Sequence, residues 1–210
     1  MFLCWSVKGG SGTTVVAAAL ALMFARSRPT LLVDLGDDAP AVLGAPEPTG
    51  PGVADWLASP TSSVDLLARL IVPVVDNLEL LPRGLQEWRS ATRWPDLANA
   101  LVGTGATVVI DVGVGPPPAA LEAIADHSLL VTRSCYPSLR RAAKLTDPPT
   151  GVVLVLEPGR ALGARDVEHA VGAPVIAVVH YDPAVARAVD SGLMSSRLPR
   201  SLSHALRAVA

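Results

Sequence analysis

Cysteine is scarce in this 210-residue sequence, and no long hydrophobic run occurs in it. The only two cysteines, Cys4 and Cys135, lie far apart along the chain, which excludes a disulfide framework and a zinc site of closely spaced thiols. No stretch reaches the ~20 apolar residues that a membrane span requires. The first apolar run ends at Lys8, too early for the apolar region of a signal peptide. These absences predict a cytoplasmic protein with reduced thiols.

Charged residues are also few, at 17% of the sequence, and the net charge of −2 gives no general reason to expect binding to nucleic acid. The four histidines match no metal-binding spacing. Apolar residues are abundant instead: 50% of the sequence is hydrophobic, and a chain of this length suits one domain with a sizeable core. We therefore expect a single domain over residues 1–210.

Short apolar runs alternate with longer amphipathic stretches, a pattern typical of an α/β domain with a mainly parallel sheet, here of seven or eight strands. The runs are rich in Val, Leu and Ile, as expected for strands that helices cover on both faces. The expected strands are 2–7, 30–34, 78–81, 107–112, 128–132, 151–156 and 175–179. The expected helices are 13–25, 64–71, 95–102, 117–125, 139–145, 164–171, 183–189 and 198–209. Residues 36–60, rich in Gly and Pro, are expected to form a loop with short helical turns.

A glycine-rich loop, "KGGSGTT", lies at residues 8–14 between the first expected strand and a long expected helix. Gly9, Gly10 and Gly12 can adopt positive φ, so that backbone N–H groups, including that of Ser11, converge on an anion. The N-terminus of the following helix adds partial positive charge, and the Thr14 hydroxyl could bind Mg²⁺. The alternative is a tight connection with no ligand. Three glycines in four residues favour a phosphate-binding loop.

The lysine of this loop is not in the usual place. A Walker A loop reads G-x-x-x-x-G-K-[ST], and its lysine position is occupied here by Thr13. Lys8 stands five positions upstream, and the only other lysine in the chain is Lys144, against fifteen arginines. A lysine retained in the loop indicates a site that requires a compact ammonium group, although chance retention is the alternative.

Two aspartates follow hydrophobic strands. "TLLVD" ends at Asp34, and "TVVIDVG" contains Asp111 near its end. In a phosphate-binding α/β fold the strand carrying Asp111 would lie beside the first strand, which would bring its carboxylate close to the metal. Asp34 could orient an attacking water. Both could instead only terminate strands and cap loops, as aspartate often does.

Several motifs occur together in the order found in the MinD/ParA ATPases, the P-loop family with a deviant Walker A motif. They are "KGGSGTT", "LLVDLG", "LELLPRG", "VVIDVG", "ADHSLLVT" and "VVHYDPAVARAVDSG". The sequence resembles this family over residues 2–209, most closely its CpaE- and TadZ-like branch, which is associated with pilus and secretion machinery.

The resemblance implies a three-layer P-loop NTPase fold, ATP or ADP with Mg²⁺, a nucleotide-sandwich homodimer and a further protein partner. It implies that residues 8–14 bind phosphate, that Thr14 and Asp111 hold the metal, and that Asp34 assists catalysis. It also implies that Lys8 reaches across the dimer to the phosphates of the partner subunit.

The sequence departs from this family at three places. Thr13 replaces the in-loop lysine, and the usual D-x-D after the second strand reads Asp34-Leu35-Gly36. The Asn that commonly follows the strand at 151–156 and reads adenine is absent, so a base pocket would depend on His180, Asp182 and Pro183. These departures predict a weak ATPase that dimerises with ATP and positions a cellular machine, or alternatively a pseudo-ATPase scaffold that hydrolyses nothing.

Two further surfaces leave alternatives open. The segment 198–209 places Leu202 and Leu206 on one helical face, which predicts a helix packed on the sheet, with membrane contact the less favoured alternative. Arginines late in the sequence offer a basic surface, but the net charge argues against binding to DNA. Location at a membrane or at the nucleoid is therefore the weaker prediction. Trp88 and Trp94 either form an exposed surface for a protein partner or close the edge of the core.

Overall fold

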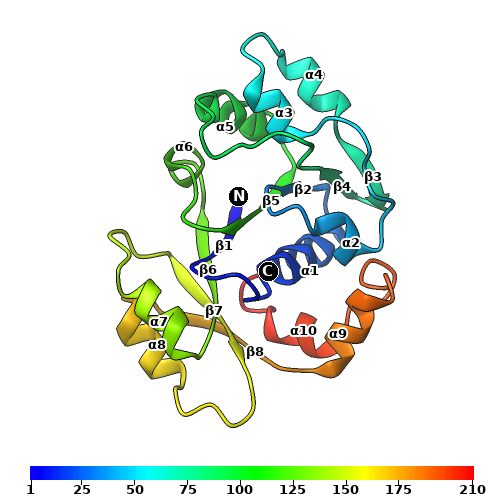
Figure 1. The fold of residues 1–210 in the computed structure, drawn as a ribbon. Helices are drawn as coiled ribbons and strands as arrows, with labels where there is room; N and C mark the ends of the chain where they lie inside the picture. The colour runs from blue at the N-terminus through cyan, green and yellow to red at the C-terminus, as the bar shows by residue number, and fades with distance from the viewer.

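A computed structural model describes all 210 residues and contains a single eight-stranded sheet (Figure 1). The strands are β1 (Phe2–Ser6), β2 (Thr30–Asp34), β3 (Val72–Val75), β4 (Leu78–Leu81), β5 (Thr107–Val114), β6 (His127–Arg133), β7 (Gly151–Leu156) and β8 (Val175–His180). Their order across the sheet is β3-β4-β2-β5-β1-β6-β7-β8, and every pair is parallel except β3 with β4. The carboxyl ends of the seven parallel strands therefore meet at one edge.

Helices cover both faces of the sheet. The helices are α1 (Thr13–Ala25), α2 (Ala39–Leu43), α3 (Val53–Ala58), α4 (Val64–Arg69), α5 (Trp94–Gly103), α6 (Ala119–Glu122), α7 (Tyr136–Ala142), α8 (Ala164–Val171), α9 (Pro183–Asp190) and α10 (Arg200–Ala205). One apolar cluster lies under α3 to α8, and a second lies under α1, α2, α9 and α10. Figure 1 shows these two groups on opposite sides of the strands. The predicted three-layer α/β architecture is confirmed.

Helix α1 lies at the centre of one face and is buried almost all round, with ten of its thirteen residues buried. Its run of alanines allows the helix to approach β5 and β1 closely, while Leu20 and Phe24 fill the remaining space. A buried and tightly packed helix holds its N-terminus in a fixed position. That N-terminus carries the glycine-rich loop.

The strand predictions agree with the structure more closely than the helix predictions do. The bounds of β2, β4, β7, α1 and α8 are as predicted. Strand β3 was missed because it is a short, mostly exposed edge strand with a proline inside it. The predicted helix at 117–125 shrinks to the single turn of α6, and the last helix spans only Arg200–Ala205. The predicted helix at 139–145 begins earlier, at Tyr136, because Pro137 suits the first turn.

The C-terminal helix packs on the sheet, as we favoured. Leu202 and Leu206 are 1% and 0% exposed and belong to the apolar cluster under α1. Its apolar face is therefore covered by the protein itself. No helix in the structure combines the length and the hydropathy needed to cross a bilayer.

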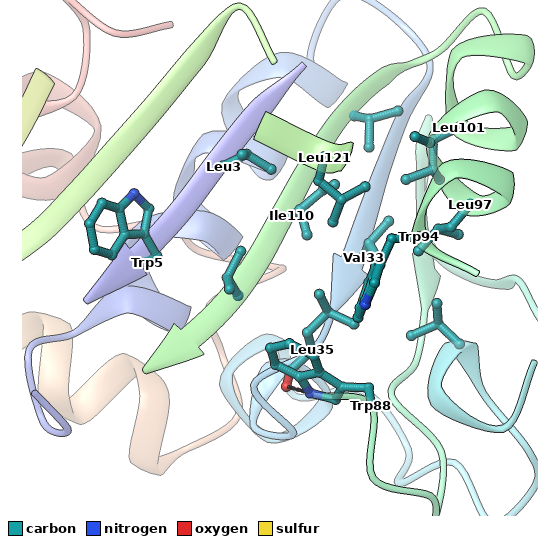
Figure 2. Close-up of a cluster of buried hydrophobic side chains, with 14 of the residues drawn as sticks. Leu3, Trp5, Val33, Leu35, Trp88, Trp94, Leu97, Leu101, Ile110 and Leu121 are labelled. Atoms are coloured by element: carbon teal, nitrogen blue, oxygen red, sulfur yellow. Dashed lines mark hydrogen bonds between the residues drawn. The ribbon is translucent and has the colours of Figure 1, made fainter. Parts of the chain in front are cut away.

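Trp88 and Trp94 are both buried, so the hypothesis of an exposed aromatic surface is wrong and the alternative is confirmed. Their rings pack edge to face, with centroids 5.5 Å apart. The Trp88 indole N–H donates to the backbone carbonyl of Leu35 at 2.8 Å, and the two rings extend the core beyond the end of β2 (Figure 2). The sequence could not separate these alternatives because burial depended on how the segment 82–94 folds back over the sheet.

Arg93 holds together the irregular segment that follows α3. Its guanidinium lies 4.1 Å from the ring centroid of Trp56 and donates to the carbonyl oxygens of Trp56, Ser59 and Ser62. It also pairs with Asp96 at 2.9 Å. One side chain therefore satisfies the carbonyl groups of Ser59 and Ser62, which accept no backbone hydrogen bond, and adds a second donor to that of Trp56.

Replacing this side chain should destabilise the protein. We expect Arg93→Ala to lower the free energy of unfolding by about 2 kcal/mol, because it leaves partly buried carbonyls unpaired and removes the cation–π contact. Urea denaturation monitored by tryptophan fluorescence measures the change. Arg165→Ala, at an exposed position on α8, is the control and should leave the midpoint unchanged. Equal midpoints for both variants would contradict this role of Arg93.

Candidate functional site

The glycine-rich loop connects β1 to α1 at the edge where the parallel strands end. Gly10 and Gly12 have φ of 74° and 89°, so the predicted positive φ is confirmed at these two positions and is wrong for Gly9. Gly12 is the N-cap of α1 and supplies no side chain to cap it. The first N–H groups of this helix therefore remain available to an anion. Inside the loop, the Ser11 hydroxyl donates to the carbonyl of Lys8 at 2.7 Å.

A cleft of about 950 Å³ opens over this loop. Residues 9–15 line it together with the chain segments that follow β2 and β4, the last three residues of β5 and the end of α9. Thr13 and Thr14 both line the cleft, and Thr13 is nevertheless only 7% exposed. The predicted placement of the loop between the first strand and the long helix is confirmed, whereas its binding of phosphate stays a prediction. A cleft of this size can hold a nucleotide.

Asp111 lies beneath the cleft on β5 and is fully buried. Strand β5 pairs directly with β1, as the sequence predicted. One carboxylate oxygen, Oδ1, accepts from the backbone N–H of Gly113 at 3.0 Å, whereas Oδ2 has no hydrogen-bond partner. Burial raises the pKa of Asp111 to about 7, against the lowering effect of the Thr14 side chain. A buried carboxylate oxygen without a hydrogen-bond donor is electrostatically costly unless a cation neutralises its charge.

These residues fit Mg²⁺. The ion prefers oxygen ligands and is usually held by one or two carboxylates and by substrate phosphates, so a cage made only of protein groups is not required. The structure contains no cluster of three or more His, Cys, Asp or Glu side chains that could hold a metal. Asp111 and Thr14 would supply one carboxylate oxygen and one hydroxyl. The backbone of Gly36 leaves the space beside Oδ2 open, because a Cβ there would lie 2.8 Å from that oxygen.

Asp34 lies beside Asp111 in the register of β2 and β5, but its contacts are different. Its carboxylate accepts from the backbone N–H groups of Gly36, Asp37 and Ala39 at 2.8–3.1 Å. The side chain is buried, which raises its pKa to about 6 in spite of these donors. The observed contacts are those of a loop cap. A role in orienting water stays a prediction.

Lys8 does not line the cleft in this single chain. Its ammonium group donates to the carbonyl of Gly9 at 3.3 Å. The preceding residue is fixed from α7, where the Arg141 guanidinium donates to the carbonyl of Val7 at 3.2 Å. Lys8 is thus held at the outer end of the loop. Its predicted contact with a partner subunit is not tested by one chain.

The predicted base-binding residues His180, Asp182 and Pro183 do not line the cleft either. They lie where β8 ends and α9 begins. The Asp182 carboxylate caps α9 through the N–H of Ala184 at 2.8 Å and accepts from the Ser201 hydroxyl at 2.6 Å. The predicted helix start is confirmed. Recognition of a base by these residues stays a prediction.

The sequence analysis did not predict that three charged residues after β4 line the cleft: Arg83, Glu87 and Arg89. They follow β4, in a segment with no hydrophobic periodicity. The order and direction of the strands could have predicted that these residues reach the cleft. Because β4 is parallel to β2, its carboxyl end meets the edge that carries the glycine-rich loop, so the residues after it reach the same cleft.

The sequence matches the family described as "CobQ/CobB/MinD/ParA nucleotide binding domain" over residues 2–195. By sequence alone, no curated protein matches significantly. Among solved structures, a ParA family ATPase from Chlorobium tepidum TLS is similar, with 20% identity, a TM-score of 0.77, and 99% of this chain and 98% of that chain covered.

Two structures containing nucleotide are also similar to this chain. The septum site-determining protein MinD of Pyrococcus horikoshii OT3, in complex with Mg-ADP, has 21% identity and a TM-score of 0.72, covering 99% of this chain and 93% of that chain. The McdA(D38A)–ATP complex of Cyanothece has 15% identity and a TM-score of 0.71, covering 100% and 96%. At such identities the likeness establishes a common fold, that of the P-loop NTPases. Together with the family match over most of its length, it means that this chain belongs to the CobQ/CobB/MinD/ParA family of nucleotide-binding domains.

Proposed function

We propose that this protein is a nucleotide-dependent dimerisation switch that binds ATP with Mg²⁺ and hydrolyses it slowly. The observation that carries the proposal is the buried Asp111 carboxylate, whose Oδ2 lacks a hydrogen-bond partner and lies beside the backbone of Gly36, beneath the cleft that opens over the glycine-rich loop. Burying such a group without a cation is costly, and a divalent ion beside phosphate would offset the cost. The Mg-ADP of MinD and the ATP of McdA in similar structures support the same ligand class.

In this proposal different residues of the chain bind the phosphates, hold the metal ion and position the loop. The free N–H groups at the start of α1 and in residues 9–13 bind phosphate, and Thr14 and Asp111 hold the ion, which neutralises phosphate charge. Asp34 keeps the loop at 36–39 closed over Asp111 through three backbone contacts. Lys8 supplies its ammonium to the phosphates of a second copy, where the in-loop position offers only Thr13.

The proposed biological role is to position another machine. The motif resemblance to the CpaE- and TadZ-like branch favours a pilus or secretion apparatus, and a septum or partition apparatus is the broader possibility within the family. A similar solved structure is the MinC:MinD cell division protein complex of Aquifex aeolicus, which supports a partner protein for this chain. A cytoplasmic location, with membrane or nucleoid contact made through that partner, is part of the same proposal.

A pseudo-ATPase scaffold is the second candidate, and one specific observation favours it. The position of the second Asp of the usual D-x-D is Gly36, whose backbone lies so close to Asp111 that a Cβ would be 2.8 Å from Oδ2. An Asp side chain therefore does not fit at 36 in the present backbone. With Thr13 also lacking an ammonium, two groups that support phosphoryl transfer are absent from the cleft.

Lys8→Ala separates these candidates. We expect the unaltered protein to dimerise with Mg-ATP and not with Mg-ADP, and the variant to remain monomeric, because the ammonium that bridges the two copies is gone. Light scattering after size exclusion measures the mass, and phosphate release measures hydrolysis. Lys144→Ala, which alters the only other lysine, is the matched control and should behave as the unaltered protein does. Dimers without nucleotide and no phosphate release would instead support the scaffold.

A further inference from the structure

The cleft has little positive charge for a site that would bind phosphate. Its lining contains three carboxylates, Asp38, Glu87 and Asp190, and only two cations, Arg83 and Arg89. Lys8 lies outside the lining, and the in-loop position carries the neutral Thr13. A nucleoside triphosphate would bring several more negative charges into this cleft. A cation from elsewhere in the same chain is therefore the missing element.

The two arginines of the cleft differ in their partners. The Arg83 guanidinium forms ion pairs with Asp37 at 2.6 Å and with Glu87 at 3.0 Å. Two carboxylates thus already neutralise Arg83. Arg89 takes part in none of the six ion pairs of the structure. It is the cation of the cleft that has no anionic partner.

Arg89 is nevertheless held in place. Its guanidinium lies 4.3 Å from the ring centroid of Trp88, which is buried and anchored through its N–H to the carbonyl of Leu35 (Figure 2). Nη2 donates to the carbonyl of Val114 at the end of β5. An exposed arginine fixed at both the ring and the carbonyl loses less rotamer entropy when it binds a ligand. One donor is used, and the remaining donors of the guanidinium fork are free for phosphate oxygens.

Arg89 lies at the side of the cleft formed by β5, the strand that carries Asp111. Val114 follows Asp111 on β5 by three residues, and its Cγ2 lies 3.9 Å from a Cβ built on Gly9 at the start of the glycine-rich loop. The N–H of Gly115 donates to the carbonyl of Ser6 at 2.8 Å, which ties the same segment to the end of β1. Asp111 on the same strand would hold Mg²⁺, which would supply positive charge to the outer phosphates. A cation at this strand end would therefore lie near the outer phosphates.

We propose that Arg89 binds the terminal phosphate of a nucleoside triphosphate within its own subunit, and so makes the site discriminate triphosphate from diphosphate. The guanidinium supplies positive charge that Thr13 does not provide, from a segment outside the glycine-rich loop. A planar fork with several donors suits two oxygens of one phosphate group. The inference rests on the proposed function, because it requires that residues 9–14 bind a nucleotide.

The test is a pair of affinities measured by isothermal titration calorimetry, for Mg-AMPPNP and for Mg-ADP. We expect Arg89→Gln to weaken binding of the triphosphate analogue about tenfold and to change binding of the diphosphate by less than about twofold, as a single charge-assisted contact to the last phosphate predicts. Arg89→Lys keeps the positive charge but not the planar guanidinium, so its affinity for Mg-AMPPNP should lie between those of the unaltered protein and Arg89→Gln. Arg165→Gln removes an arginine outside the cleft and is the control.

The same measurements in the Lys8→Ala background isolate contacts made within one subunit, because dimers should not form there. Equal losses for the two nucleotides, or no loss for either, would overturn the role of Arg89 while leaving nucleotide binding intact. If the unaltered protein binds neither nucleotide, both the proposed function and this inference are overturned. The thermal midpoint of each variant, expected to fall by no more than about 4 °C because an exposed cation–π contact contributes little to stability, excludes unfolding as the cause.

Discussion

Asp111→Asn should make the nucleotide-free protein more stable and at the same time weaken its binding of Mg-nucleotide by more than about tenfold. The amide keeps the acceptor that contacts the Gly113 N–H at 3.0 Å but removes a fully buried negative charge whose Oδ2 has no partner. We expect the free energy of unfolding at pH 8 to rise by about 1–3 kcal/mol, since an uncompensated buried charge is costly. Stability and function are thus opposed at this position.

The pH dependence of the free energy of unfolding tests the buried charge of Asp111 more directly than a single measurement at pH 8. Burial raises the pKa of Asp111 from 3.8 to about 7, so the folded state holds a proton that the unfolded chain releases. The stabilising contribution of this raised pKa is complete below pH 3.8 and is lost as the pH rises through about 7. Asp34, with a pKa raised to about 6, adds to the same trend. Stability of the unaltered protein should therefore fall from pH 5 to pH 8, and Asp111→Asn should flatten the fall.

Urea denaturation at pH 5, 6, 7 and 8 in the presence of a chelator measures this profile. A matched control is Asp147→Asn, at an exposed position away from the cleft, which should leave both the profile and nucleotide binding unchanged. For binding, we expect Asp111→Asn to weaken Mg-ADP by more than about tenfold, the loss of one charged ligand to a metal site. A variant that is less stable than the unaltered protein at pH 8 would contradict the view that Asp111 is destabilising without a cation.

The parts of this site that could be predicted from the sequence are those fixed by local patterns. The glycine-rich loop, the helix after it and the two aspartates that follow apolar strand residues were found because each depends on a few neighbouring residues. The roles of Asp34 and Asp111 could not be separated in the same way. Both follow a run of buried apolar strand residues, and only the folded structure shows that three N–H groups engage Asp34 while Asp111 Oδ2 has none.

The segment after β4 was the least predictable part. Its two tryptophans carry no period that would distinguish a buried ring from an exposed one, and long-range packing against Leu35 decides the outcome. The placement of Arg89 depends in turn on that packing, through the Trp88 ring and the carbonyl of Val114. A residue whose position is set by contacts with β2 and β5 leaves no signature in its own neighbourhood of the sequence.

Thr13→Lys should produce the largest gain in nucleotide affinity that a single change offers in this chain. Position 13 is the first residue of α1 and lines the cleft, so a lysine there would extend its ammonium toward bound phosphate. We expect binding of Mg-AMPPNP to strengthen by about 1.5–3 kcal/mol, or about 10- to 150-fold, the contribution of a charge-assisted contact. The nucleotide-free protein should lose about 0.3–1 kcal/mol, because a cation at a helix N-terminus is unfavourable.

Thr13→Met is the control, since it has similar length and lacks the charge. Calorimetry should show no gain for Thr13→Met, and equal affinities for the two variants would contradict an electrostatic origin of the weak binding. Phosphate release by Thr13→Lys then distinguishes the two candidate functions. Faster release would mean that the missing ammonium alone limits turnover, since catalysis here depends on positioning and charge. Tighter binding with no release would locate the block at Gly36, where the close approach to Asp111 leaves no room for a second aspartate.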